Sequence, residues 1–206
     1  MPRRVSSLYS PLNIPWLYDL FQGFALGGQH FPRFVEEFIR PFPGCRVLDI
    51  GCGTALILKY LPKADYHGFD ANPAYIEAAR RRHAENPRAR LHCGLVKEAT
   101  GLPGTFDIVI AHSVLHHLDD TEAGALFRLA HEALLPQGRL VTLDGAITAG
   151  QSFWERFFAS RDRGRYVRTP EAYLALARPV FADCRGTDSF RVSRIPMTFW
   201  VMEGLK

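Results

Sequence analysis

Short strand-like runs alternate with helix-like segments from about residue 45 onward, and this alternation constrains the fold more than any other feature of the chain. Each run is short, rich in branched or aromatic side chains and bounded by turn residues, as expected of a strand buried on both faces. Strands separated by helices predict an α/β domain with a mainly parallel sheet. The runs cover residues 45–50, 66–70, 89–93, 106–111 and 138–144.

Helical signals fill the intervening segments. Asn72 is a suitable N-cap for a helix over residues 73–85, which starts with a proline, and Thr121 is a suitable N-cap for a helix over 121–135. Residues 31–40 place their aromatic side chains on one helical face and are expected to pack against the sheet.

The last third of the chain follows a different pattern. A helix is expected over residues 169–177, and two strands are expected within residues 184–203, with a turn near Thr187. Because only a short connection joins these two strands, they should pair antiparallel.

Composition indicates one ordinary globular domain. The chain has 206 residues, 47% of them hydrophobic, with 25 Lys plus Arg against 21 Asp plus Glu and a formal charge of +4. The four cysteines form no CxxC pair, so neither a metal site nor a disulfide framework is predicted. No secretion signal and no apolar run near the roughly 18 residues of a membrane span is evident, so a cytoplasmic location is expected.

The run VLDIGCGTA at residues 47–55 carries the strongest functional signal. Two glycines, Gly51 and Gly53, allow the chain to turn tightly after a strand and to approach a ligand, and a helix after them would present free N–H groups to it. A dinucleotide fingerprint needs a third glycine where Leu56 stands. The carboxylate of Asp49 would oppose a pyrophosphate and suits a ligand that carries an ammonium group.

This acidic-x-Gly-x-Gly pattern resembles the first motif of the class I S-adenosylmethionine-dependent methyltransferases. Further matches follow in order over about residues 45–145, in GFDANP (68–73), FDIVIAHSVLHHLDD (106–120) and LLPQGRLVTLDG (134–145). The resemblance implies a doubly wound, seven-stranded, mostly parallel sheet with one antiparallel strand near the C-terminus. It also implies S-adenosylmethionine as methyl donor and S-adenosylhomocysteine as product.

The resemblance implies a donor site as well. Asp70, at the end of the second strand, stands where the family holds the ribose hydroxyls. Many relatives carry an Asp for the adenine amino group after the third strand, whereas this chain has Leu95 and Val96, so apolar packing and main-chain contacts are expected there. The implied donor-binding set is Asp49, Gly51, Cys52, Gly53, Asp70, Ala71, Leu95, Val96 and His112.

His112 is the candidate catalytic residue. It stands at the carboxyl end of the fourth strand, where open α/β sheets place their ligands, and it could act as general base toward an oxygen or nitrogen acceptor; simple packing is the alternative. His116 and His117 belong to an LHHL pattern that recurs in the family largely as a structural turn.

Acceptor binding is assigned to the segments outside the core. Residues 151–169 mix Phe and Arg and could form a lid whose arginines hold a carboxylate or phosphate, with Arg163 and Arg165 as candidates; a surface helix is the alternative. Tyr18 is a candidate pocket residue near the N-terminus, by resemblance to relatives. The arginines of the lid segment are Arg156, Arg161, Arg163, Arg165 and Arg168.

The sequence therefore predicts a methyltransferase that acts on an O, N or C nucleophile of a small molecule, including an anionic, sugar or lipid one. RNA or protein acceptors, a non-catalytic donor-binding module and an oxidoreductase remain alternatives, although the small net charge disfavours nucleic acid. A monomer or homodimer is expected. One domain over 1–206 divides into a helical cover (1–42), a donor-binding core (43–145), a lid-like insertion with a helix (146–182) and C-terminal strands (183–206).

Overall fold

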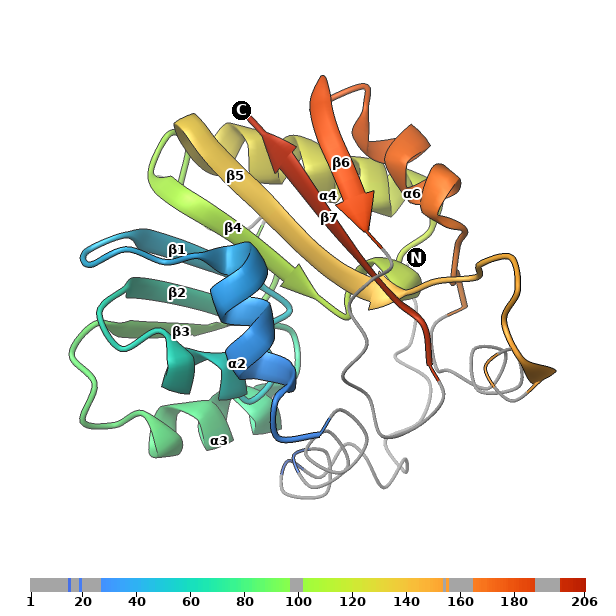
Figure 1. The fold of residues 1–206 in the computed structure, drawn as a ribbon. Helices are drawn as coiled ribbons and strands as arrows, with labels where there is room; N and C mark the ends of the chain where they lie inside the picture. The colour runs from blue at the N-terminus through green and yellow to red at the C-terminus, as the bar shows by residue number, and fades with distance from the viewer. Residues whose placement is uncertain are drawn as a thin grey trace, which may run out of the picture.

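A computed structural model describes residues 15, 19, 27–96, 102–153, 155, 165–187 and 197–206. These residues form one seven-stranded sheet in the order β3-β2-β1-β4-β5-β7-β6. The antiparallel strand is β7, which pairs with β5 on one side and β6 on the other, so the remaining strands run parallel (Figure 1). The strands are β1 (Arg46–Ile50), β2 (Asp65–Asp70), β3 (Ala89–Cys93), β4 (Phe106–His112), β5 (Leu134–Gly145), β6 (Asp183–Thr187) and β7 (Phe199–Leu205).

Helices cover both faces of the sheet, and each face has its own apolar core. One core joins α2 (His30–Phe34), the π-helical turn η2 (Val35–Ile39) and α3 (Pro73–Arg82) to the sheet. The other joins α4 (Asp120–Ala133) and α6 (Pro170–Ala177) to the opposite face (Figure 1). The doubly wound fold class predicted from the sequence is confirmed.

Most predicted elements occur within a few residues of their expected bounds. The side chain of Asn72 accepts a hydrogen bond from the Ala74 amide at 3.0 Å, as expected for the N-cap of α3. The side chain of Thr169 caps α6 in the same way. Strand β5 is longer than predicted, because it also includes residues 134–137.

Two local predictions are wrong. Asp119, not Thr121, caps α4, because its carboxylate accepts the Glu122 amide while the Glu122 side chain accepts the Asp119 amide in a capping box. A short 3-10 turn, η3 (Leu56–Tyr60), follows the glycine loop where a helix was expected, since Pro62 leaves too few residues for an α-helix. The helix predicted over 31–40 is present and packs against the sheet, with α geometry over His30–Phe34 and π geometry over Val35–Ile39.

The described helices include none that is long and apolar enough to cross a membrane.

Candidate functional site

The glycine loop lies at the carboxyl end of β1 and makes a tight turn toward β2. Gly51 and Gly53 have φ values of +75° and +55°, in the left-handed region that glycine adopts without steric penalty. The Gly51 and Cys52 amides both donate to the Phe69 carbonyl, at 2.8 and 3.0 Å. A Cβ on Gly51 would lie 2.6 Å from Cγ2 of Val114, so a side chain at residue 51 would clash.

Asp49 is buried beneath this loop. Its Oδ2 accepts a hydrogen bond from the Tyr66 hydroxyl at 2.5 Å, and among the described residues its Oδ1 has no hydrogen-bond partner. Burial raises the pKa of Asp49 to about 7, the Tyr66 hydrogen bond opposes that rise, and the charge of Asp70 adds to it. A buried carboxylate oxygen that accepts no hydrogen bond, beside a cavity, can accept one from a ligand bound there.

Asp70, at the end of β2, is hydrogen bonded to the glycine loop. Its Oδ2 accepts the Gly53 amide at 2.9 Å, and its Oδ1 accepts the Asn72 amide at 2.8 Å. Burial raises the pKa of Asp70, and these two main-chain hydrogen bonds oppose the rise. The neighbouring Ala71 is exposed.

A second set of contacts connects the N-terminal cover to the residue after the loop. The Thr54 hydroxyl donates to Asp19, and the guanidinium of Arg82 pairs with the same carboxylate. Arg82 also donates to the Thr54 carbonyl at 2.7 Å. The cover is therefore hydrogen bonded to the glycine-loop region at Asp19.

His112 shares a cavity with the glycine loop. The cavity lies on the α2 face, at the carboxyl ends of β1 and β4, the edge where open α/β sheets place their ligands. Burial lowers the pKa of His112 to about 4; a hydrogen bond to the main chain of residue 112 opposes this, and the nearby His116 adds to it. The imidazole is therefore neutral at pH 7. The cavity is lined by Phe31, Asp49, Gly51, Cys52, Thr54, Leu56, Ile57 and His112.

A second imidazole contacts His112. His30, from the first turn of α2, lies with its Nε2 atom 2.8 Å from Nε2 of His112, and its side chain is fully buried. Burial, with a smaller contribution from the charge of His112, lowers the pKa of His30 to about 2. The rings of Phe31 and Phe34 pack against His112, with centroids 5.3 and 5.6 Å from it.

The remaining predicted site residues fall in different places. Val96 is buried in the core on the α4 face, whereas Leu95 is about half exposed, 47%. Arg165 is exposed. Tyr18 and Arg163 lie outside the described residues, as do Arg156 and Arg161.

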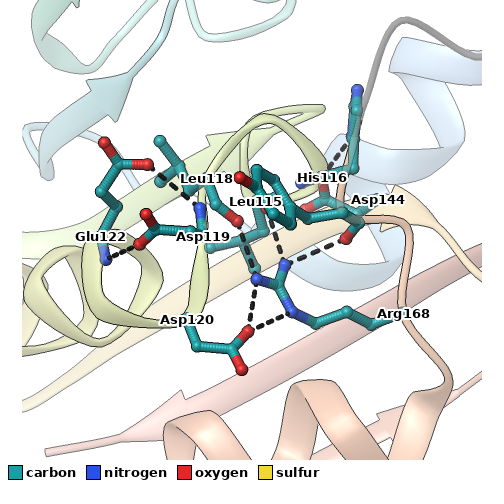
Figure 2. Close-up of polar contacts among 9 residues, drawn as sticks. Leu115, His116, Leu118, Asp119, Asp120, Glu122, Asp144 and Arg168 are labelled. Atoms are coloured by element: carbon teal, nitrogen blue, oxygen red, sulfur yellow. Dashed lines mark hydrogen bonds and ion pairs between the residues drawn. The ribbon is translucent and has the colours of Figure 1, made fainter.

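Arg168 is not an acceptor-binding arginine, and its inclusion among the lid arginines is wrong. Its buried guanidinium donates to the main-chain carbonyls of Leu115 and Leu118 at 3.0 and 2.7 Å, and it pairs with Asp120 at 2.7 Å (Figure 2). It thus holds the turn between β4 and α4 in place. The sequence shows only that Arg168 stands in a stretch rich in arginine, and it gives no sign that this side chain is buried.

His116 belongs to the same turn. Its Nδ1 lies 2.7 Å from Oδ1 of Asp144, and its amide donates to the same oxygen at 3.2 Å (Figure 2). Burial raises the pKa of Asp144, and the hydrogen bonds and charge of His116 oppose the rise. These contacts agree with a structural role for His116 in the turn.

Sequence reasoning missed several residues of the site, namely His30, Thr54, Tyr66, Asp19 and Arg82. One signal was present for His30: it stands four residues before Phe34, and so on the apolar face of the expected helix, where a polar side chain needs a partner. Tyr66, in a buried strand, also needed a partner for its hydroxyl. The other three depend on contacts between distant segments, which no local pattern indicates.

Comparisons with known proteins agree with this geometry. A family model described as a methyltransferase domain matches residues 47–138. The ubiquinone biosynthesis O-methyltransferase of Azorhizobium caulinodans is 35% identical over 117 residues, 55% of this chain and 45% of that protein. The protein of the same name from Methylocella silvestris is 33% identical over 129 residues, 58% and 49% of the two chains. The chain thus spans about half the length of these curated relatives.

Solved structures show the same fold. Phosphoethanolamine N-methyltransferase 2 of Haemonchus contortus, in complex with S-adenosyl-L-methionine, has a TM-score of 0.74 at 16% identity, with 95% of this chain and 56% of that chain covered. A methyltransferase domain model therefore matches residues 47–138 of this chain, a region that includes the glycine loop, and the fold is shared with a solved methyltransferase.

Proposed function

We propose that this chain binds S-adenosylmethionine and transfers its methyl group to a hydroxyl oxygen of a small-molecule acceptor. The observation that carries the proposal is a neutral imidazole, His112, in the same cavity as the glycine loop. A hydroxyl must lose its proton as it attacks, so an O-methyltransferase gains from a neutral base at this position. The names of the O-methyltransferase relatives support an oxygen acceptor.

The residues at the loop fit the donor. Asp49 has a buried oxygen without a partner among the described residues and lines the cavity, which suits the ammonium group of the methionine part. The left-handed glycines and Cys52 let the main chain approach the ligand closely. When bound, S-adenosylmethionine supplies a methyl group on a positively charged sulfur.

The donor's adenosine part is assigned to the next two strand ends. Asp70 and Ala71 would meet the ribose hydroxyls, and Asp70 would exchange a hydrogen bond from Gly53 or Asn72 for one from the sugar. Leu95 and Val96 would contribute an apolar edge for adenine. The exposure of Leu95, 47%, is consistent with this role, because it leaves apolar surface at this edge of the sheet.

Methyl transfer to a hydroxyl then requires that the acceptor be positioned against the donor and that a base accept the hydroxyl proton. The aromatic rings of Phe31 and Phe34 limit water around His112, and the hydroxyl of the acceptor aligns with the donor's methyl group while its proton passes to His112. Tyr18, Arg163 and Arg165 remain proposed acceptor contacts. The apolar surroundings of His112 favour a flat, partly apolar acceptor.

Calorimetric titration tests the donor assignment. S-adenosylmethionine and S-adenosylhomocysteine should both bind, and a nicotinamide dinucleotide should not. The absence of binding by both sulfur compounds would overturn the proposed function, and binding of the dinucleotide would revive the oxidoreductase alternative.

Donor affinity should depend on pH through Asp49. Its pKa of about 7 in the free protein means that binding an ammonium group below pH 7 must release the carboxyl proton. Between pH 7 and 5.5, where the donor's amino group stays protonated, the affinity should fall by up to about tenfold per pH unit. Among the described residues, the other ionisable groups that act on Asp49 are Tyr66, Asp70 and Cys52.

Calorimetry in buffers of different ionisation enthalpy measures both the affinity and the proton release. Asp49→Asn should bind the donor more weakly and without proton release, and Asp65→Asn, at the start of β2 and far from the loop, should behave as wild type. A wild-type affinity that does not change over this pH range would contradict the role of Asp49. In the free protein the raised pKa also means that the folded state holds the Asp49 proton more tightly than the unfolded state does. The free energy of unfolding should therefore fall as the pH rises from about 4 to about 7.

A further inference from the structure

A fully buried tyrosine contacts Asp49 beside the cavity. The Tyr66 hydroxyl, from β2, donates to Oδ2 of Asp49 at 2.5 Å, and the Tyr66 side chain has no exposed surface. Oδ1 of Asp49 accepts no hydrogen bond from the described residues, and Asp49 lines the cavity together with the glycine loop. The two carboxylate oxygens therefore have different surroundings: one is hydrogen bonded within the protein, and the other is available to a ligand.

The register of the sheet brings Tyr66 to Asp49 across a glycine. Gly68 is paired with Asp49 between β2 and β1, and Tyr66 stands two residues before Gly68, on the same face of the sheet. A Cβ on Gly68 would lie 2.8 Å from Cε1 of the Tyr66 ring and 2.8 Å from Sγ of Cys52. The absence of a side chain at Gly68 therefore leaves the space in which the Tyr66 ring reaches the carboxylate.

The hydroxyl stabilises the ionised form of Asp49. Burial and the charge of Asp49 raise the pKa of Tyr66 well above its usual value, so the hydroxyl keeps its proton and remains a donor. Its hydrogen bond lowers the pKa of Asp49, whereas burial and the charge of Asp70 raise it. The Cys52 thiol stays protonated because burial raises its pKa, and His112 of β4 lines the same cavity. Among the described residues, Tyr66 is thus the group that favours a charged Asp49.

We propose that Tyr66 is a positioning residue for donor binding: its hydroxyl fixes Oδ2 of Asp49, keeps the carboxylate ionised and leaves Oδ1 free for the ammonium group of S-adenosylmethionine. This inference rests on the proposed donor site and involves no acceptor molecule. Without the hydroxyl, the buried carboxyl would hold its proton more tightly. An arriving ammonium group would then have to displace that proton, and the donor would bind more weakly at neutral pH.

Calorimetry of donor binding tests this role. At pH 7 the wild type should release about half a proton per S-adenosylmethionine, because Asp49 is about half protonated there. Tyr66→Phe keeps the ring and removes the hydroxyl, so the release should approach about one proton, and the affinity at pH 7 should fall about five- to twentyfold. In the Asp49→Asn background, which has no carboxyl proton, Tyr66→Phe should change the affinity by less than about twofold.

Tyr173→Phe is a matched control for the loss of a buried hydroxyl. Tyr173 is 1% exposed, and its hydroxyl donates to the Gly145 carbonyl at 3.0 Å on the other face of the sheet. This variant should lose stability and keep the wild-type donor affinity and proton release. Wild-type affinity and proton release in Tyr66→Phe, or an equal fall in affinity in Tyr66→Phe and Tyr173→Phe, would assign Tyr66 to packing alone.

The ionisation of Asp49 can also be measured without the donor. The carbon-13 shift of its carboxyl group should titrate near pH 7 in the wild type, and at a higher pH in Tyr66→Phe. Gly68→Ala is a second variant, because its Cβ would displace the Tyr66 ring, and its midpoint should rise as well. An unchanged midpoint in both variants would overturn the inference. Failure of the wild type to bind S-adenosylmethionine would instead overturn the proposed function itself, so the two failures are distinguishable.

Discussion

Replacement of Arg168 with methionine is expected to lower the free energy of unfolding by about 3 to 5 kcal/mol, because three main-chain carbonyls lose a charged hydrogen-bond donor. The guanidinium donates to three main-chain carbonyls, those of Leu115, Leu118 and Tyr166, at 3.0, 2.7 and 3.0 Å. Each buried carbonyl that loses its donor costs about 1 to 3 kcal/mol. Methionine fills much of the volume but donates nothing.

Two further variants identify which contacts matter. Asp120→Asn should cost less than about 1 kcal/mol, because the Asp120 side chain is 76% exposed and exposed ion pairs contribute little. Arg128→Met, on the exposed surface of α4, should change stability by less than about 0.5 kcal/mol. Urea unfolding followed by circular dichroism measures all three. A stable Arg168→Met variant with weakened acceptor binding would contradict the structural role and restore Arg168 to the lid.

Replacement of Gly51 with alanine is expected to weaken binding of S-adenosylmethionine by about 10- to 100-fold, which corresponds to about 1 to 3 kcal/mol of local strain. The alanine would have to adopt a φ of +75°, and its Cβ would lie 2.6 Å from Cγ2 of Val114. Val114 is β-branched and has few alternative rotamers, so the glycine loop must move away from the donor.

A matched glycine separates this clash from the general effect of a left-handed residue. Gly44 has a φ of +81°, and an alanine Cβ there would have no atom within 4 Å, so Gly44→Ala has the same backbone strain without a clash. It should lose some stability and keep its donor affinity. Val114→Ala in the Gly51→Ala background should recover part of the affinity. Calorimetry that found equal donor affinity in wild type and Gly51→Ala would exclude the loop from the donor site.

The position and backbone conformation of the glycine loop were predictable because their determinants are local. Glycines at 51 and 53 follow a strand, and Asp49 and Asp70 stand at the ends of two strands that pair side by side. The parallel sheet alone brings these residues to one edge. No long-range contact had to be guessed.

The histidine pair and the contacts of Arg168 were not predictable in this way. His30 and His112 are 82 residues apart in the sequence, and their contact depends on how α2 packs across the sheet. Arg168 stands in a stretch rich in arginine, and its burial depends on the path of the turn after β4. Side chains that hydrogen bond to main-chain groups far away in the sequence produce no periodic pattern of residue types.

The proposed reaction is tested most directly by mass spectrometry with S-adenosylmethionine that carries a trideuterated methyl group. The protein would be incubated with small hydroxylated aromatic compounds, with RNA and with protein extracts, and His112→Gln would serve as the variant in the base. The account predicts that the label appears on an oxygen of a small molecule and that His112→Gln slows its transfer. Label only on nitrogen, carbon, RNA or protein, or donor binding without any transfer, would contradict it.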